Sequence, residues 1–191
     1  MNVWFCSDAH FAHKNICKYT DRSKFTSQED HDHWLVSKWN KYVKPDDLVY
    51  HLGDFCFSEK LFVEYVNKLN GVKCFIKGNH DSSKAVNKVL SLPSVSSFTS
   101  YKEVKIEGQQ IILCHFPFSV WHKQHYGSWN LYGHCHGSHT PVGKQLDVGF
   151  DNAYKVLGEH RPFSFSEVLQ FMQKQCKIVP DHHVIREAEV L

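Results

Sequence analysis

The stretch VKCFIKGNHD, residues 72–81, is the most informative segment of this chain. Its first half, residues 72–76, is a short apolar run of the kind that forms a buried strand. The run then passes through a glycine into amide, imidazole and carboxylate side chains, namely Asn79, His80 and Asp81. In α/β sheets, ligands bind in the crevice beyond the carboxyl ends of the strands. This segment therefore predicts a strand that delivers polar side chains to a binding site.

Four other apolar runs end in the same way. They lead into Ser7-Asp8-Ala9-His10, Gly53-Asp54, Cys114-His115 and Gly133-His134-Cys135-His136. Asp8 and His10 are two positions apart, so in an extended chain both side chains face the same side. Carboxylate, amide and imidazole groups together suit Mn, Fe, Zn or Ni without selecting among them. The set is too large for one tetrahedral ion and fits two ions that share a carboxylate, a known device for phosphoester hydrolysis.

Hydrophobic periodicity predicts alternating strands and helices in the first half of the chain and mostly strands in the second. Capping-box spacing opens two expected helices, at Thr26–Glu29 and at Ser164–Glu167, and the last expected strand covers residues 145–150. This pattern favours a layered α/β architecture in which helices cover a sheet. No repeat or linker divides the chain, so we expect one domain over residues 1–191.

Charge and cysteine usage narrow the class of protein. Twenty-two Lys+Arg against 20 Asp+Glu leave a net charge of +2, so a nucleic-acid partner is possible but is not indicated by charge. Seven cysteines without a C-x-x-C pair predict reduced thiols and a cytoplasmic protein. No signal-peptide pattern and no membrane-spanning run of about 18 apolar residues is found, so we expect no membrane partner.

The ordered motifs D-x-H, G-D, G-N-H-D, an isolated H and G-H-x-H resemble those of the calcineurin-like metallophosphoesterase superfamily. The matching segments run from Asp8 to His136, about two thirds of the chain. Residues 7–16 and the later segment 147–151 are similar to a small single-domain branch found in bacteria and phages. The resemblance implies a four-layer α-β-β-α sandwich with a di-metal site at the carboxyl ends of the strands.

The resemblance also implies a role for each matching residue. The expected ligands are divided between two ions and share Asp54 as a bridge: Asp8, His10 and His136 at the first ion, and Asn79, His115 and His134 at the second. His80 would contact the phosphate and protonate the leaving group, and Asp81 would orient its ring. A water that bridges the two divalent ions would attack phosphorus, with manganese as the expected metal and iron, zinc or nickel as alternatives.

One departure from the superfamily bears on the substrate. Its protein phosphatases carry an arginine shortly after the Gly-Asp motif, whereas Phe55-Cys56-Phe57-Ser58 follows Asp54 here. The departure favours a phosphodiesterase acting on a small nucleotide-type ester. A phosphomonoesterase is one alternative. A non-catalytic binding module, as in the retromer scaffold subunit, is another, although the complete ligand set and His80 argue against it.

Residues outside these motifs have open roles. His13 and His122 are candidate substrate contacts, and the aromatic loop 116–129 either stacks a nucleobase or packs onto the sheet. Asp147 and Asp151 are expected to be structural or to support ligands. Most other histidines are expected in the core or at the surface: His51 in the core, and His31, His33, His139, His160, His182 and His183 at the surface.

Overall fold

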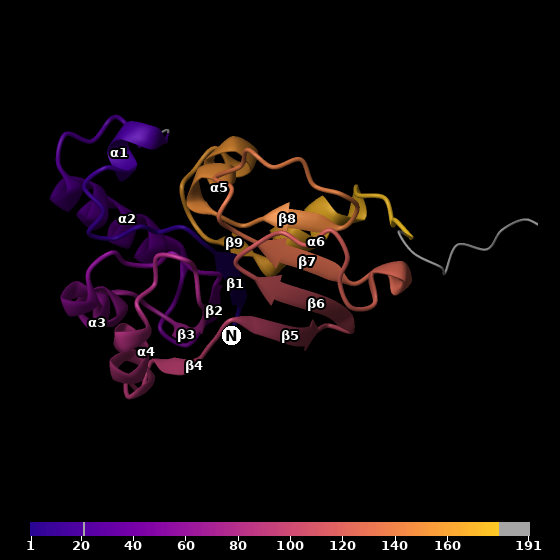
Figure 1. Ribbon diagram of the computed structural model, residues 1–191, viewed down its shortest axis with the longest axis horizontal. Helices are drawn as coiled ribbons and strands as arrows, with labels where there is room; N and C mark the ends of the chain where they lie inside the picture. The colour runs from indigo at the N-terminus through magenta and orange to yellow at the C-terminus, as the bar shows by residue number, and fades with distance from the viewer. Residues whose placement is uncertain (21, 180–191) are drawn as a thin grey trace, which may run out of the picture.

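The computed structural model describes residues 1–20 and 22–179, and it contains two β-sheets that pack against each other (Figure 1). One sheet has the strand order β4-β3-β2-β1-β9 and the other the order β5-β6-β7-β8. The strands are β1 (Val3–Cys6), β2 (Leu48–His51), β3 (Val72–Ile76), β4 (Val95–Thr99), β5 (Tyr101–Ile106), β6 (Gln109–Cys114), β7 (Trp129–Tyr132), β8 (Gln145–Asp147) and β9 (Phe163–Ser164). The helices are α1 (Ile16–Tyr19), α2 (Gln28–Tyr42), α3 (Glu59–Lys68), α4 (Ser83–Leu90), α5 (Phe150–Leu157) and α6 (Phe165–Gln173), with a 3-10 turn at Gln124–Tyr126.

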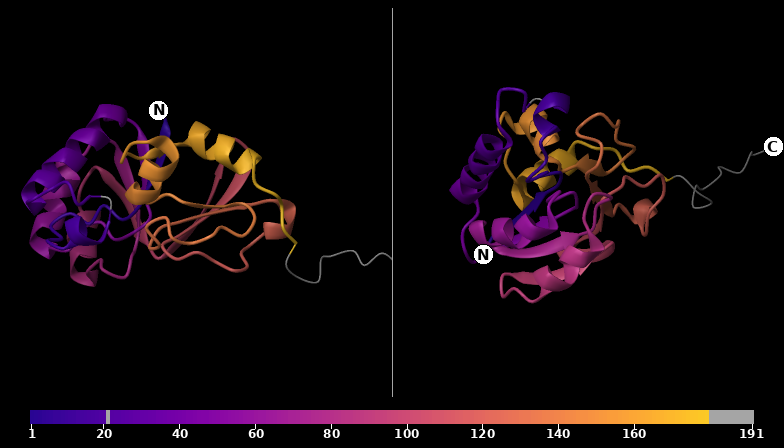
Figure 2. Two further views of the ribbon diagram at one scale, coloured as in Figure 1. Left: turned by 90° about the horizontal axis from the view of Figure 1, so that it is seen from above. Right: turned by 60° about the vertical axis from the view of Figure 1, so that its left-hand side comes forward.

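Strand alternation divides the apolar side chains between two cores. In β1, Trp4 and Cys6 pack toward the helices, whereas Phe5 packs toward the other sheet. The same alternation continues in β2 and β3, so the first core lies between this sheet and α2, α3 and α4. The second core lies between the two sheets, and α6 packs across β1, β9 and β8 (Figure 2). The expected two-sheet α/β fold is thus confirmed.

Parallel pairing brings the carboxyl ends of the strands to one place. Cys6 at the end of β1 pairs with His51 of β2, which in turn pairs with Phe75 of β3. In the second sheet, Leu113 of β6 pairs with Leu131 of β7 in parallel. Within each sheet, the polar motifs therefore follow the strands at the same end, where the carboxyl ends of the parallel strands lie side by side.

The outer face of the second sheet is covered by the loop between β6 and β7. The backbone N–H of Phe118 donates to Asn130 Oδ1, and Gln145 Nε2 donates to the Phe118 carbonyl. Trp121 of the same loop is buried and donates its indole N–H to the Ser128 carbonyl. Polar side chains on this face thus fasten a long loop by specific hydrogen bonds.

The boundaries of some elements differ from the sequence expectation. The expectation of one strand over residues 145–150 is wrong: β8 ends at Asp147, whose carboxylate accepts from the N–H of Gly149, and α5 begins at Phe150. A turn closed by an aspartate in this way ends a strand locally. The first capped helix begins one residue later than expected, because Ser27 rather than Thr26 accepts from Asp30. The capping box at Ser164 is confirmed.

None of the helices in residues 1–20 and 22–179 combines the length and apolar character that a membrane crossing requires.

Candidate metal centre and active site

The loops after the strands hold their polar residues in an unusual backbone conformation. Five of the seven expected ligands have a positive φ of 49–67°, namely Asp8, His10, Asp54, His134 and His136. Left-handed backbone is unfavourable for residues with a Cβ and persists where the surrounding structure imposes it. Hydrogen bonds between the loops impose it here, because the N–H groups of Asp8 and His10 donate to the carbonyls of Gly53 and Asp54. Such strain is typical of functional sites.

Two glycines allow the loops to approach closely. A Cβ on Gly78 would overlap the carboxylate and backbone N of Asp54, and a Cβ on Gly133 would overlap Ser7 Oγ and Asp8 Oδ2. Neither glycine has a positive φ, so each is needed for space rather than for backbone conformation.

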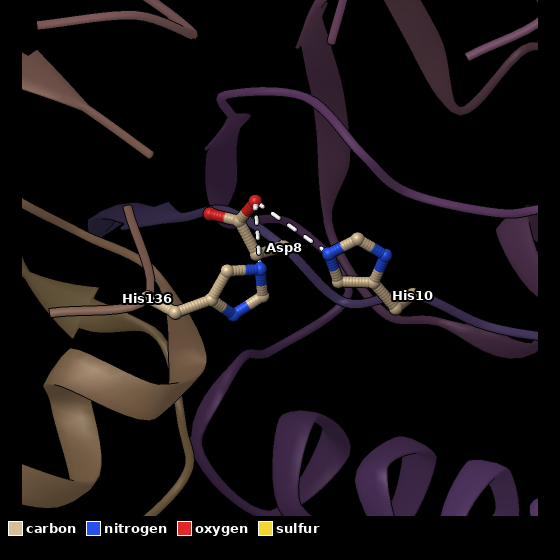
Figure 3. A group of neighbouring side chains, drawn as sticks. All are labelled: Asp8, His10 and His136. Atoms are coloured by element: carbon tan, nitrogen blue, oxygen red, sulfur yellow. Dashed lines mark ion pairs between the residues drawn. The ribbon is translucent and has the colours of Figure 1, made fainter. Parts of the chain in front are cut away.

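The first group of expected ligands comes from the loop after β1 and the loop after β7. Asp8, His10 and His136 bring one ligand atom each to within 4.8 Å of one another. Nε2 of His10 lies 3.7 Å and Nε2 of His136 lies 4.0 Å from the same oxygen, Asp8 Oδ1 (Figure 3). Burial opposes ionisation of Asp8, but the adjacent histidines outweigh it and hold the pKa of its carboxyl well below the usual range.

The second group comes from the ends of β2, β3, β6 and β7. Asp54, His115 and His134 also bring one ligand atom each to within 4.8 Å. Asn79 Oδ1 lies between them, 3.0 Å from His115 Nε2 and 3.0 Å from His134 Nδ1. The structure thus places all seven expected ligands in two adjacent groups.

The carboxylate of Asp54 faces both groups. Its Oδ2 lies 4.0 Å from Nε2 of His10 in the first group and 3.5 Å from Nε2 of His115 in the second. Burial opposes ionisation of this carboxyl too, but contact with His115 outweighs it, and the pKa of Asp54 is lowered. An ionised carboxylate in this place is suited to bridge two cations.

The donor atoms of both groups fit metal ions. His115 Nδ1 lies 2.8 Å from the Leu52 carbonyl, which leaves its Nε2 directed at Asp54. This arrangement is usual for a ligating imidazole, whose second nitrogen is held by an acceptor. Both ring nitrogens of buried His10 have no hydrogen-bond partner. Nε2 of His10 lies 3.7 Å from Asp8 Oδ1 and 4.0 Å from Asp54 Oδ2, and both gaps exceed a good hydrogen bond of about 2.7–3.2 Å. A buried imidazole without a hydrogen-bond partner between two carboxylates is well suited to bind a metal ion.

His80 lies beside these groups with a half-exposed ring. Its backbone N–H donates to Asp54 Oδ1, and its Nε2 lies 3.9 Å from Asp54 Oδ2. We expected Asp81 to orient this ring, but among the described residues no hydrogen bond joins its carboxylate to the imidazole of His80. Its carboxylate instead accepts from the backbone N–H groups of Gly78, Asp54 and Phe55. The hydrogen bonds from Asp54 and Phe55 join the loop after β2 to the loop after β3. Asp81 therefore connects these two loops rather than orienting the ring.

A cavity of about 710 Å³ opens over the histidines. Among the residues that the structure describes, its lining contains polar and apolar side chains and no lysine, arginine or carboxylate: His10, His13, Ile16, Thr20, His80, His134, Cys135, His136 and Ser138. His13, a candidate substrate contact, therefore lies at the cavity, and burial lowers the pKa of its ring to about 4. His122 does not line the cavity, and its Nδ1 lies 2.8 Å from Glu103 Oε2.

A buried ion pair supports His136, one of the expected ligands. Asp151 Oδ2 lies 2.6 Å from His136 Nδ1, and the contacts with Asp151 and Asp8 outweigh burial and raise the pKa of that ring. Arg22 is fully buried and donates to both carboxylate oxygens of Asp151, at 2.9 and 3.0 Å. It also donates to the carbonyls of Asp8 and Ala9. The expected supporting role of Asp151 thus has a geometric basis, whereas Arg22 has no local pattern that would have revealed it.

Two histidines expected at the surface are buried. His31 is wholly buried, with Nδ1 2.8 Å from Asp32 Oδ1, and His160 is 2% exposed against Tyr154. His51 is buried as expected, while His182 and His183 lie outside the described residues. In the loop 116–129, the rings of Trp121 and Trp129 are buried in the protein, so they are not available to stack on a nucleobase. Tyr126 is 77% exposed, and its ring is open to solvent.

Comparisons with known proteins agree with this geometry. The family model of the calcineurin-like phosphoesterase superfamily domain matches residues 1–148. An uncharacterized protein of Methanocaldococcus jannaschii is 28% identical over 90% of this chain and 92% of its own length. The Gene 66 protein of Mycobacterium phage L5 is 24% identical over 78% of this chain and 86% of its own length. The crystal structure of a protein of unknown function from Aquifex aeolicus shares the fold, with a TM-score of 0.66, 22% identity, and coverage of 89% of this chain and 98% of that chain.

Proposed function

The chain belongs to the calcineurin-like phosphoesterase superfamily, and on that premise we propose that it is a phosphodiesterase that hydrolyses a nucleotide-type phosphoester with two divalent metal ions. The observation that carries the proposal is the convergence of seven expected ligand side chains beside His80, under a cavity whose lining, within residues 1–20 and 22–179, includes no lysine or arginine. A phosphodiester carries one negative charge on its phosphate and a monoester carries two near neutral pH. The described lining offers no lysine or arginine to pair with the second charge of a monoester, which favours the diester.

The ligand side chains divide as the geometry groups them. Asp8, His10 and His136 would hold one ion, and Asn79, His115 and His134 would hold the other. Asp54, whose Oδ2 faces both groups, would be shared. The ions would neutralise the phosphate oxygens and lower the pKa of a coordinated water, which is the chemistry that such a pair supplies. We propose manganese for both ions, and zinc, iron or nickel suit the same donors.

His80 would serve as the proton donor of the reaction. Its ring borders the cavity and is 47% exposed, so it is open to a bound ester. As the bond from phosphorus to the leaving oxygen breaks, the imidazolium would transfer its proton to that oxygen, and an alcohol and a neutral ring would result. General acids of this kind contribute roughly 10²–10⁴-fold to rate. His13, on the same cavity wall, is a proposed substrate contact.

The place of action is proposed on separate grounds. All seven cysteines are free thiols, and none of them lies in a disulfide. Free thiols are usual in a reducing compartment, which supports a cytoplasmic location.

A substrate panel tests the proposed function. The full chain loaded with Mn²⁺, Ni²⁺ or Zn²⁺ is assayed on bis-p-nitrophenyl phosphate, p-nitrophenyl phosphate and a dinucleotide of thymidine. We expect kcat/KM for the aryl diester to exceed that for the monoester by about tenfold or more. The reverse ratio would establish the alternative, a phosphomonoesterase. A chain that takes up no metal on titration would refute both and leave a binding module.

A further inference from the structure

Within the part of the chain that the structure describes, the ring of His80 has no hydrogen-bonded carboxylate of the kind that usually orients a catalytic imidazole. Among the described residues its nearest carboxylate atom is Asp54 Oδ2, at 3.9 Å, which is too long for a hydrogen bond. Asp54 is also the carboxylate that faces both groups of ligands. Asp81, the neighbouring carboxylate in sequence, is engaged by three backbone N–H groups. Another contact must set the plane of the His80 ring.

Phe57 supplies such a contact. Its ring stacks on that of His80, with centroids 4.6 Å apart and planes 29° apart. A second histidine ring, His13, stacks on Phe57 at 3.8 Å and 3°. Phe57 is 37% exposed and so lies outside the core, and both histidines that it stacks on line the cavity.

The backbone of Phe57 is well placed to act as a fixed platform. Its N–H donates to the carbonyl of Phe11 at 2.9 Å, and the preceding Cys56 forms a β-bridge with Phe11. Phe11 is fully buried and follows the first metal motif directly. The backbone that carries the Phe57 ring is therefore held against the same loop that carries Asp8 and His10.

We propose that Phe57 is the positioning residue of His80: it holds the imidazole by ring stacking, in place of a carboxylate. A stack fixes the plane of a ring and leaves both of its nitrogens free, whereas a carboxylate occupies one of them. The nitrogen that donates the proton thus stays directed at the leaving oxygen of the ester. This inference rests on the proposed function of His80 as a proton donor.

Leaving groups of different quality test this role. Expulsion of an alkoxide, as from a dinucleotide, requires a proton donor, whereas p-nitrophenolate is a stable anion that leaves without one. We expect Phe57→Leu to lower kcat on the thymidine dinucleotide about 10–100-fold and to change kcat on bis-p-nitrophenyl phosphate less than about twofold. Phe57→Tyr, which keeps the ring, should restore the dinucleotide rate. Equal losses on both esters would overturn the proposal.

A double variant and a matched control sharpen the test. In a His80→Ala background, adding Phe57→Leu should leave the dinucleotide rate unchanged, because the residue through which Phe57 acts is absent. A further loss there would contradict the proposal. Tyr154 offers the control, since it is 44% exposed and stacks on His160 at 4.5 Å and 19°. Tyr154→Leu removes a comparable stack and should leave both rates unchanged.

NMR separates the stack from the activity. In the full chain loaded with diamagnetic Zn²⁺, the carbon-bound ring protons of His80, assigned by their loss in His80→Ala, should lie upfield because of the Phe57 ring current. Phe57→Leu should move them downfield, and Tyr154→Leu should not. Unmoved signals would overturn the proposal. If the wild-type chain hydrolyses neither ester, the proposed function fails, and these signals still decide whether Phe57 holds the ring.

Discussion

Removal of the buried guanidinium of Arg22 should be among the most damaging single changes in this fold. Arg22 is fully buried and donates at 2.7–3.0 Å to both oxygens of Asp151 and to the carbonyls of Asp8 and Ala9. Arg22→Met would leave a buried carboxylate without its cation and two carbonyls without donors. Breaking a buried pair from one side costs about 3–5 kcal/mol, out of a total stability of about 5–15 kcal/mol.

Urea unfolding of the chelator-treated chain measures this loss without a contribution from bound metal. For Arg22→Met we expect a lower urea concentration at the midpoint of unfolding, with little change in the dependence of the unfolding free energy on urea. The melting temperature should fall by about 6–20 °C. Arg22→Lys should recover only part of the loss, because an ammonium lacks the planar fork that engages both oxygens of Asp151. The double variant Arg22→Met/Asp151→Leu should be more stable than Arg22→Met alone, because no unpaired charge is then buried.

A cost below about 1 kcal/mol for Arg22→Met would refute this reasoning, since that is the range of a surface ion pair. A double variant less stable than either single variant would also refute it. Arg22→Met should also weaken metal binding about 10–100-fold, because Asp151 would no longer be fixed by Arg22 and would no longer hold His136 in place.

Three further substitutions probe the site and the core. Asp54→Asn should weaken the binding of both ions, because Oδ2 of Asp54 faces both groups of expected ligands. Metal analysis that still finds two ions bound with unchanged affinity would contradict the shared role. Gly133→Ala places a Cβ against Ser7 Oγ and Asp8 Oδ2, so we expect loss of the first ion at equilibrium dialysis with cooperative unfolding retained. Lys73 is 1% exposed, and burial lowers its pKa from 10.5 to about 8, so the unfolded chain binds more protons between these values. The free energy of unfolding of the wild type should therefore rise relative to Lys73→Met by up to about 3 kcal/mol from pH 8 to 10.5, and a constant difference would disprove the shift.

Local spacing along the chain is enough to predict much of the site. An apolar run followed at once by Asp, Asn or His places a polar side chain at a strand end, and parallel pairing then gathers the ends. The five ordered motifs, through their resemblance to the superfamily, predict Asp8, His10 and His136 as ligands of one ion, and the fold brings one ligand atom of each to within 4.8 Å of the others. The capping box at Ser164 is equally local, and its helix is present.

Short or irregular elements are harder to predict. The strand β4 (Val95–Thr99) has the sequence VSSFT and therefore contains no continuous apolar run, and the four-residue helix α1 is too short to show a helical period. The boundary after Asp147 depends on a side chain that turns back on its own backbone, which hydrophobic periodicity does not reveal.

Tertiary structure alone decided which distant residues serve the site. Arg22 reaches Asp151 across 129 positions, and nothing near Arg22 in the sequence distinguishes it from a surface arginine. The stack of Phe57 on His80 likewise requires two loops from different strands to meet. Sequence by itself determined the chemical identity and order of the expected ligands, because each of them follows directly on the apolar run of its own strand. The three-dimensional fold determined what holds them, because burial and long-range contacts exist only once the chain has packed.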